Sequence, residues 1–189
     1  MKYELLISDR YYHIYNRGNN KEDIFLELRN YDYFLLLLIK HVVPIAEIYA
    51  YCLLKNHFHL LIKTKNIEDE KLISKSLSNL FNAYAKAINK AYNRTGSLFQ
   101  DRFSRTMIED ENYLKRLVLY IHLNPKHHKF VEDFSSYEYS SFQQIVSKNP
   151  TFLERETVLD LFEDKENFIY VHNSRQNEII KQNDEFYLE

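Results

Sequence analysis

The 189-residue sequence predicts an α+β fold, with one antiparallel sheet and helices packed against it. Three observations carry this prediction. Short runs rich in aromatic and branched residues, bounded by turn residues, have the length of strands. Longer segments without glycine or proline have apolar residues at helical spacing. Two of the strand-like runs are separated by only two residues, which is typical of a hairpin. The chain is long enough to bury a hydrophobic core without structural disulfides.

The first strand and the first helix are predicted from residues 11 to 43. YYHIYNR (11–17) is aromatic-rich, alternates roughly and ends at Gly18, so we expect a strand followed by a turn. Asn30 is a suitable N-cap for a helix over 31–43, which is apolar on nearly all sides and should be buried. Pro44 ends this helix, because the residue before a proline avoids the helical conformation.

The next two strands form a predicted hairpin. AEIYAYCLL (46–54) and HFHLLIK (57–63) are strand-like runs separated only by Lys55 and Asn56, which indicates a tight antiparallel turn. The single cysteine of the chain, Cys52, excludes an internal disulfide and a zinc site built from several cysteines. It is compatible with a reducing cytosol.

The remaining elements complete the order of the sheet. Residues 67–93 lack glycine and proline and predict a long amphipathic helix that stops before Gly96. Residues 99–109 indicate a loop that leads into a fourth strand. Asp110 opens a further helix with acidic residues at its positive end, and Pro125 is expected to end it.

The order strand, helix, strand, strand, helix, strand predicts a ferredoxin-like (RRM-like) α+β sandwich, with helices on one face of the sheet. The other face is then available for a ligand. We expect the main domain to span residues 1–130, and residues 131–189 to form an acidic C-terminal arm with short helices.

The charge of the chain is unevenly distributed. Residues 1–130 contain 20 basic and 14 acidic residues, and residues 131–189 contain 5 and 13, giving net charges of +6 and −8. A basic first part favours nucleic acid as a partner, although +6 is also compatible with ordinary surface variation. The first ten residues contain no apolar targeting segment, and the longest apolar run is too short to span a bilayer. We therefore expect a cytoplasmic protein that does not enter membranes.

Two histidines share one face of the predicted strand 57–63. Alternate side chains of a strand point to the same side, so His57 and His59 point the same way. Neighbouring neutral imidazoles are either hydrogen-bonded core residues or metal ligands. A metal site needs at least one more ligand, and the side-chain oxygen of Asn124 would suit Mg²⁺ or Mn²⁺, although imidazole is better matched to Mn²⁺ or Zn²⁺. The residues alone leave both interpretations open.

A polar stripe runs along the helix that begins at Asp110. Tyr113, Arg116, Tyr120 and Asn124 follow one another at spacings of three and four residues, so they can face one site together. In the alternative interpretation, the tyrosines only cover the edge of the core. His122 lies about 200° around the helix from Tyr120 and is therefore a poor partner for that site.

Five segments of the chain resemble, in order, the motifs of REP-associated tyrosine transposases and their insertion-sequence transposase relatives. They are HIYNRGNN (13–20), YCLLKNHFHLLIK (51–63), GSLFQDRF (96–103), YIHLNP (120–125) and YEYSSF (137–142). The resemblance covers about residues 10–142. It is specific because the histidine pair and the tyrosine helix occur together, in the right order. One departure is Lys55, which stands where the family usually has proline.

The resemblance implies a single-strand DNA endonuclease and strand transferase of the HUH class, active in DNA transposition or recombination. It implies that His57, His59 and Asn124 bind a divalent metal, Mg²⁺ or Mn²⁺. Tyr120 would attack the scissile phosphate to leave a 5′-phosphotyrosine link and a free 3′-OH. The partner would be single-stranded or hairpin-forming DNA, bound by a monomer or a homodimer. The candidate DNA contacts are Arg17, Arg102, Arg105 and Arg116.

Two other functions stay open at this point. The chain could be a catalytically silent module that binds single-stranded nucleic acid through exposed aromatic residues of the sheet. It could also be a metal-dependent hydrolase with a water nucleophile, if Tyr120 turns away from the metal. Tyr113 is the competing nucleophile on the same stripe.

Overall fold

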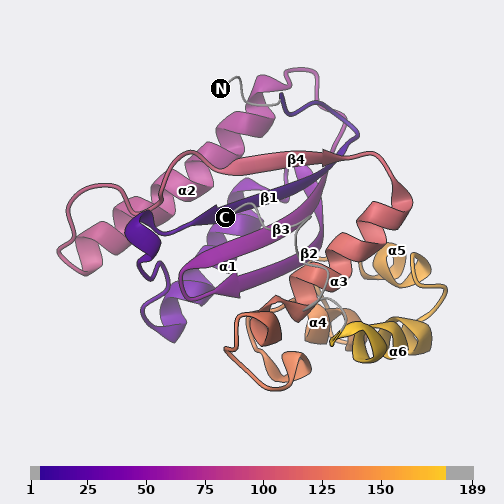
Figure 1. Cartoon of the computed structure of the whole chain (residues 1–189). Helices are drawn as coiled ribbons and strands as arrows, with labels where there is room; N and C mark the ends of the chain where they lie inside the picture. Colours follow the sequence, from indigo (N-terminus) through magenta and orange to yellow (C-terminus); the bar gives the residue numbers. More distant parts are fainter. Residues whose placement is uncertain (1–4, 178–189) are drawn as a thin grey trace.

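A computed structural model describes residues 5–177 of the chain (Figure 1). Its sheet has four strands, β1 (Tyr11–Arg17), β2 (Ala46–Leu54), β3 (His57–Thr64) and β4 (Ser104–Ile108). The strands are arranged in the order β2-β3-β1-β4, and all neighbours are antiparallel. This order and the helices between the strands confirm the predicted ferredoxin-like α+β fold. None of the helices within residues 5–177 is long and apolar enough to cross a membrane.

Helices lie on both faces of the sheet. α1 (Leu28–His41) and α2 (Lys71–Ala91) cover one face, where Phe58 of β3 contacts Phe34 and Phe81 at ring distances of 5.1 and 5.2 Å. α3 (Glu111–His127) lies on the opposite face (Figure 1). There, Tyr120 contacts His59 of β3. The expectation that helices cover one face therefore holds only for α1 and α2. The face that was expected to stay open is partly covered by α3.

The turn between β2 and β3 has the two residues that the sequence predicts, Lys55 and Asn56. The backbone oxygen of Lys55 accepts hydrogen bonds from the N–H groups of Ile24 and Phe25, at 2.8 and 2.9 Å. The oxygen of Asn56 accepts one from Gly18 at 2.8 Å. A Cβ atom at Gly18 would lie 1.9 Å from the backbone oxygen of Glu22, so only glycine lets the segment after β1 fold back this closely. The segment after β1 is thereby held against the hairpin turn, next to His57.

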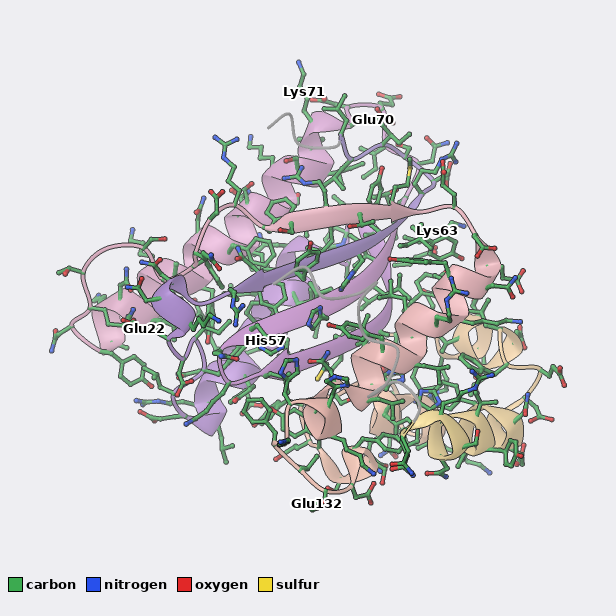
Figure 2. The ribbon with its side chains drawn as sticks, viewed as in Figure 1. Glu22, His57, Lys63, Glu70, Lys71 and Glu132 are labelled. Atoms are coloured by element: carbon green, nitrogen blue, oxygen red, sulfur yellow. The ribbon has the colours of Figure 1, made fainter. Side chains whose placement is uncertain are left out.

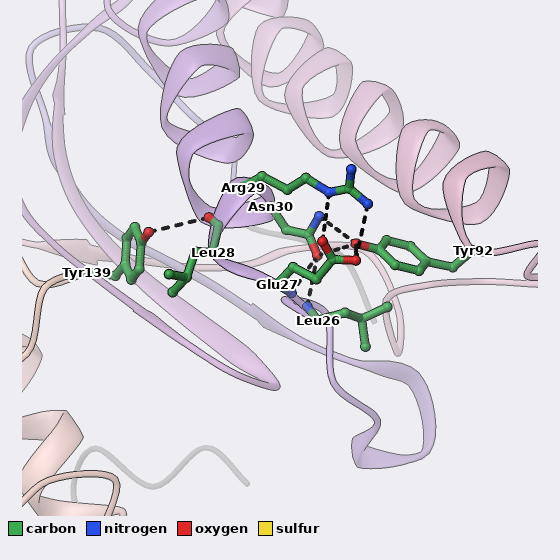
Figure 3. Close-up of polar contacts among 7 residues, drawn as sticks. All are labelled: Leu26, Glu27, Leu28, Arg29, Asn30, Tyr92 and Tyr139. Carbon is green, nitrogen blue, oxygen red and sulfur yellow. Dashed lines mark hydrogen bonds and ion pairs between the residues drawn. The ribbon is translucent and has the colours of Figure 1, made fainter.

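The start of α1 differs from the prediction by three residues. Glu27 is the N-cap, and Asn30 is the third residue of the helix, where the two side chains form a capping box. Asn30 Oδ1 accepts from the backbone N–H groups of Leu26 and Glu27. The Tyr92 hydroxyl donates to Glu27 Oε1 at 2.8 Å and so connects the end of α2 to the start of α1 (Figure 3). Asn30 therefore stabilises the predicted terminus from inside the helix.

The two ends of α3 differ in how well they were predicted. Asp110 caps its start by accepting hydrogen bonds from the N–H groups of Asn112 and Tyr113, as predicted. The predicted stop at Pro125 is wrong, because the helix continues to His127. A proline in the last turn removes one intrahelical hydrogen bond, and the next one still forms, from His128 N to Asn124 O at 3.0 Å. The two extra residues place the ring of His128 next to that of His57 on the sheet.

Residues 131–177, called here the C-terminal segment, pack along β2 and α3 (Figure 1). They contain α4 (Phe142–Val146), α5 (Arg155–Asp160) and α6 (Lys165–Arg175). Two isolated bridges, between Cys52 and Ser140 and between Ile48 and Leu153, join this segment to β2. The predicted boundary at residue 130 stays a prediction, and residues 178–189 lie outside the described residues.

A chain of buried hydrogen bonds ties α3 to the C-terminal segment, and its proton positions are determined. His172 Nδ1 lies 2.7 Å from the backbone oxygen of Phe168, which can only accept, so this nitrogen carries the proton. His172 Nε2 must then accept from His122 Nδ1 at 2.9 Å. His122 Nε2 in turn accepts from the Ser141 hydroxyl at 2.7 Å. This relay satisfies both imidazoles only while they are neutral.

We expect the relay to make the protein less stable in mild acid. Burial lowers the pKa of His172 to about 3 and that of His122 well below its ordinary value. The unfolded chain, with histidine pKa values near 6.5, therefore binds more protons below that pH. Above about pH 6.5 the two histidines are neutral in both states, so the free energy of unfolding should be at its full value with respect to them. It should fall on acidification by up to about 1.4 kcal/mol per pH unit for each histidine.

Urea unfolding at pH 7 and pH 5 measures this effect. The matched variant combines His122→Leu with His172→Phe. In this variant the Ser141 hydroxyl can still donate to the backbone oxygen of Tyr51, 3.2 Å away. We expect this variant to be less stable at pH 7 but to lose less stability between the two pH values. An unchanged loss would show that the two histidines are not the cause.

Candidate active site

A cavity of about 360 Å³ lies on the α3 side of the sheet. It is lined by residues from β1, the start of β3, the loop before β4, and α3. Five residues predicted from the sequence line it together: His57, His59, Tyr120, Arg17 and Arg102. We call this cavity the site cavity. His57 lies at the end of β3 that borders it, and Lys63 lies towards the far end of the strand (Figure 2).

The side chains of His57 and Asn124 lie next to each other. His57 Nδ1 lies 2.7 Å from Asn56 Oδ1, an acceptor, so Nδ1 carries the proton and Nε2 has the lone pair. Nε2 lies 3.2 Å from Asn124 Oδ1. Asn124 is fully buried, and its Nδ2 has no hydrogen-bond partner among the described residues. The amide oxygen of Asn124 and the Nε2 lone pair of His57 are close enough to bind one cation together, so they fit a metal site.

His59 contributes one free ring nitrogen. Its Nδ1 lies 2.9 Å from His13 Nε2, which leaves Nε2 of His59 for another ligand. Burial, and secondarily the proximity of His13 and His57, lower the pKa of His59 well below its ordinary value. Burial is also the main cause that lowers the pKa of His57 to about 3. Both imidazoles are therefore neutral at pH 7, which is the form that binds metal ions.

Tyr120 is the tyrosine that the fold places beside the histidines. Its ring lies edge-on to His59, with ring centres 5.2 Å apart. Tyr120 is only 5% exposed and belongs to the core, yet it lines the cavity. Tyr113 is partly buried and absent from the cavity lining, with the Arg116 guanidinium 5.7 Å from its ring centre. Seven residues of helix separate the two tyrosines by about 10 Å, so only one of them can reach the site. Of the two tyrosines, Tyr120 is therefore the one that the fold places at the site cavity.

The predicted basic residues occupy different surfaces. Arg17 and Arg102 line the site cavity together with Lys21. Arg105 lies in a neighbouring cavity of about 560 Å³, which also contains Arg102, and its guanidinium lies 4.2 Å from the ring centre of Phe103. Arg116 is exposed on α3 and does not line either cavity. Three of the four predicted arginines thus lie in or beside the site, and Arg116 lies apart from it.

Several lining residues were not predicted from the sequence, among them three aromatic side chains close to the histidine pair. His13 and Tyr15 lie on β1, on the same face as the histidine pair, because Tyr15 pairs directly with His59. Their alternate spacing was visible, but not which strand would lie next to β3. His128 lies beyond the predicted end of α3, and its ring centre is 4.7 Å from that of His57.

The donor set for a metal is small. No group of three or more His, Cys, Asp or Glu side chains that could hold a metal ion occurs within residues 5–177. The donors predicted from the sequence are the imidazoles of His57 and His59, which line the cavity, and the amide oxygen of Asn124, which lies next to His57. Such a set leaves coordination positions open for substrate oxygens, as catalytic metal sites do.

A ferredoxin-like sheet with a His-Phe-His strand, facing a tyrosine on a third helix, has the features of a tyrosine transposase. Comparison with known proteins agrees. The family model of IS200-like transposases matches residues 7–124, which is more than half of the chain. The chain belongs to the IS200-like transposase family.

Two similar proteins are more specific. A REP-associated tyrosine transposase of Haemophilus influenzae is 29% identical over 109 residues, which cover 53% of this chain and 61% of that protein. The match thus spans about three-fifths of the relative. The solved structure of a REP-associated tyrosine transposase bound to a REP hairpin has a TM-score of 0.67 at 21% identity. The alignment covers 79% of this chain and 88% of that one, and it confirms the fold.

Proposed function

We propose that this chain cuts and rejoins single-stranded or hairpin DNA through a covalent tyrosine intermediate, as a transposase acting in DNA transposition or recombination. One observation carries the proposal: Tyr120, His57 and His59 line the same cavity within one chain. A protein that only binds DNA needs neither a hydroxyl nucleophile nor neutral imidazoles with free lone pairs at one point.

The scissile phosphate binds in the site cavity, where Arg17, Lys21 and Arg102 offset its charge. The Tyr120 hydroxyl attacks phosphorus, so a tyrosine O–P bond forms and the bond from phosphorus to the 3′ oxygen breaks. The tyrosine loses its proton and the departing 3′ oxygen gains one, which leaves a 5′-phosphotyrosine and a 3′-OH. Because the phosphodiester energy is kept in the new bond, another 3′-OH can reverse the step without ATP.

A divalent cation fits this reaction. Mg²⁺ or Mn²⁺ bound by His57, His59 and Asn124 would neutralise charge on the non-bridging phosphate oxygens and make phosphorus more electrophilic. The role of the protein is to keep these three side chains converged. Asn56 fixes the proton of His57, and the rigid sheet fixes the spacing of the pair.

The DNA partner is a hairpin or single strand whose unpaired nucleotides reach the site cavity. Support comes from the similar protein whose structure was solved with a REP hairpin. It also comes from Tyr15, whose ring lines the cavity and is inclined by 26° to that of His59, with centres 5.9 Å apart. An aromatic ring at the wall of a cationic cavity is a stacking surface for an unpaired base.

Tyr120 acts in its own chain. Its ring is in contact with His59 of the same chain, and the relay through His122 holds α3 in this position. Mixing Tyr120→Phe protein with His59→Ala protein tests this directly, because a tyrosine acting across a dimer would restore activity in the mixture. We expect no covalent adduct in the mixture, and its appearance would contradict the assignment.

Incubation with an oligonucleotide that carries a break just 5′ of the cleavage site tests the function itself. The short fragment 5′ of the cut, which carries the released 3′-OH, diffuses away, so the covalent intermediate accumulates as a protein–DNA band that survives denaturing electrophoresis. We expect this band to depend on Mg²⁺ or Mn²⁺. Tight DNA binding without a band would instead identify a silent binding module. Cleavage without a band would indicate a water nucleophile.

We expect DNA affinity to depend on salt through the arginines of the site cavity. Each phosphate contact releases counterions, so the logarithm of the binding constant falls with the logarithm of salt concentration by about 0.7 per contact on single strands. Arg17→Gln and Arg102→Gln should each reduce this slope by about 0.7. Arg116→Gln is the matched comparison, since Arg116 lies outside the cavity. An equal reduction there would support Arg116 as a DNA contact, which is the role predicted for it from the sequence.

A further inference from the structure

His13 is a third buried histidine beside the candidate metal ligands. It lies on β1, the strand between β3 and β4, and it is only 3% exposed. Its Nε2 is 2.9 Å from His59 Nδ1, and the two rings are nearly parallel, with centres 5.1 Å apart. The proposed reaction assigns no role to it.

We propose that His13 is a positioning residue that accepts the Nδ1 proton of His59 and thereby keeps the Nε2 lone pair of His59 available to a divalent cation. The assignment rests on the proposed metal site, and it goes beyond it by naming the residue that fixes the form of His59.

The number of protons on the two rings decides which of them is the donor. A neutral imidazole carries one N–H, and a 2.9 Å contact between two ring nitrogens holds one hydrogen. If His13 donated it, the proton of His59 would sit on Nε2, and that nitrogen could not bind a cation. If His59 donates it, its Nε2 has a free lone pair. His13 must then carry its own proton on Nδ1.

The same requirement is already met at His57. Asn56 Oδ1 accepts the Nδ1 proton of His57, which leaves Nε2 with its lone pair. Asn56 and His13 are therefore equivalent in role, each being the acceptor behind one ligand. Outer hydrogen bonds of this kind typically change metal affinity by about 10- to 100-fold.

The sheet register makes the contact rigid. Tyr15 of β1 pairs directly with His59, and His13 pairs with Leu61, so His13 lies diagonally across from His59 on the same face. β4 pairs with the other edge of β1, and the Tyr15 ring packs 4.8 Å from that of His13. His13 cannot leave this position without distorting the centre of the sheet.

Two variants separate hydrogen bonding from packing. His13→Gln offers a side-chain oxygen where Nε2 was, and His13→Leu fills a similar volume without an acceptor. Mn²⁺ affinity of the full chain without DNA, measured by calorimetry, should fall about 10- to 100-fold in His13→Leu. It should stay within about threefold of wild type in His13→Gln. Thermal unfolding of both variants checks that they fold, and His59→Ala gives the value for the broken site.

Equal losses in both variants, or no loss in His13→Leu, would overturn the role of His13 as an acceptor. A wild-type chain that binds no Mn²⁺ would overturn the metal site together with this role. Nitrogen-15 NMR of the imidazoles distinguishes the two cases, because it needs no metal. We expect the metal-free wild type to carry the His59 proton on Nδ1. A proton on Nε2 would overturn the assignment of His13 even if the metal site stands.

Discussion

Tyr120→Phe should form no covalent adduct with DNA, while its fold and its DNA affinity stay unchanged. The substitution removes one oxygen and leaves the ring that packs against His59. Because the nucleophile itself is lost, adduct formation should fall by at least about 10⁴-fold. Gel analysis of the adduct with the broken oligonucleotide measures the effect, and anisotropy with the same DNA measures affinity.

Two other tyrosines are the matched controls. Tyr113→Phe should leave the adduct unchanged, because Tyr113 packs against the core away from the site cavity. Tyr15→Phe is the more demanding control, since Tyr15 lines the same cavity. The Tyr15 ring, which is the proposed stacking surface, is kept in that variant. Loss of the adduct in Tyr15→Phe but not in Tyr120→Phe would transfer the nucleophile role from α3 to β1.

The second large effect is expected for His57→Ala and His59→Ala. Each variant lacks one of the two imidazole donors. A bound metal ion lowers the free energy of the transition state of such reactions by several kcal/mol. Metal-dependent cleavage should therefore fall by about 10³-fold or more. DNA affinity should change little, because phosphate and stacking contacts supply most of it.

His128→Ala is the control for these variants. His128 lines the same cavity, and its ring centre lies 4.7 Å from that of His57. It is not one of the three proposed metal ligands. Its cleavage rate should stay within about threefold of wild type at saturating Mn²⁺. Wild-type cleavage by His57→Ala would refute the metal site, and a loss in His128→Ala as large as in His57→Ala would add His128 to the donors.

Strands and the hairpin could be predicted because their signals are local. The two-residue turn at Lys55 and Asn56 follows from the lengths of the runs beside it. Helix ends were less predictable. Asn30 has the chemistry of a cap, but a capping box places such a residue inside the helix as readily as before it. Pro125 signals a stop, yet a proline in the last turn removes only one hydrogen bond.

The site was partly predictable because some of its residues are neighbours on one strand or one helix. Spacing along one strand or one helix puts His57 with His59, and Tyr120 with Asn124. Spacing could not choose between Tyr113 and Tyr120, because both lie on one stripe, and the crossing point of α3 over the sheet decides. His13 was missed because its neighbour His59 is 46 residues away, and their contact depends on strand order and register.

The relay shows a further limit of local reasoning. Helix geometry correctly excluded His122 from the side of α3 that carries Tyr120. Its actual partners, Ser141 and His172, belong to the C-terminal segment, and nothing in the spacing of the helix indicates them. The acidic charge of that segment suggested an arm, whereas its contacts hold the tyrosine helix in place.

Mapping the covalent link in the wild-type protein tests the central claim most directly. The adduct is formed with the broken oligonucleotide and Mn²⁺, digested with protease and nuclease, and sequenced by mass spectrometry. We predict one modified peptide, with a nucleotide 5′-phosphate on Tyr120. A phosphate on Tyr113 or Tyr15, or cleaved DNA with no modified peptide, would contradict the account.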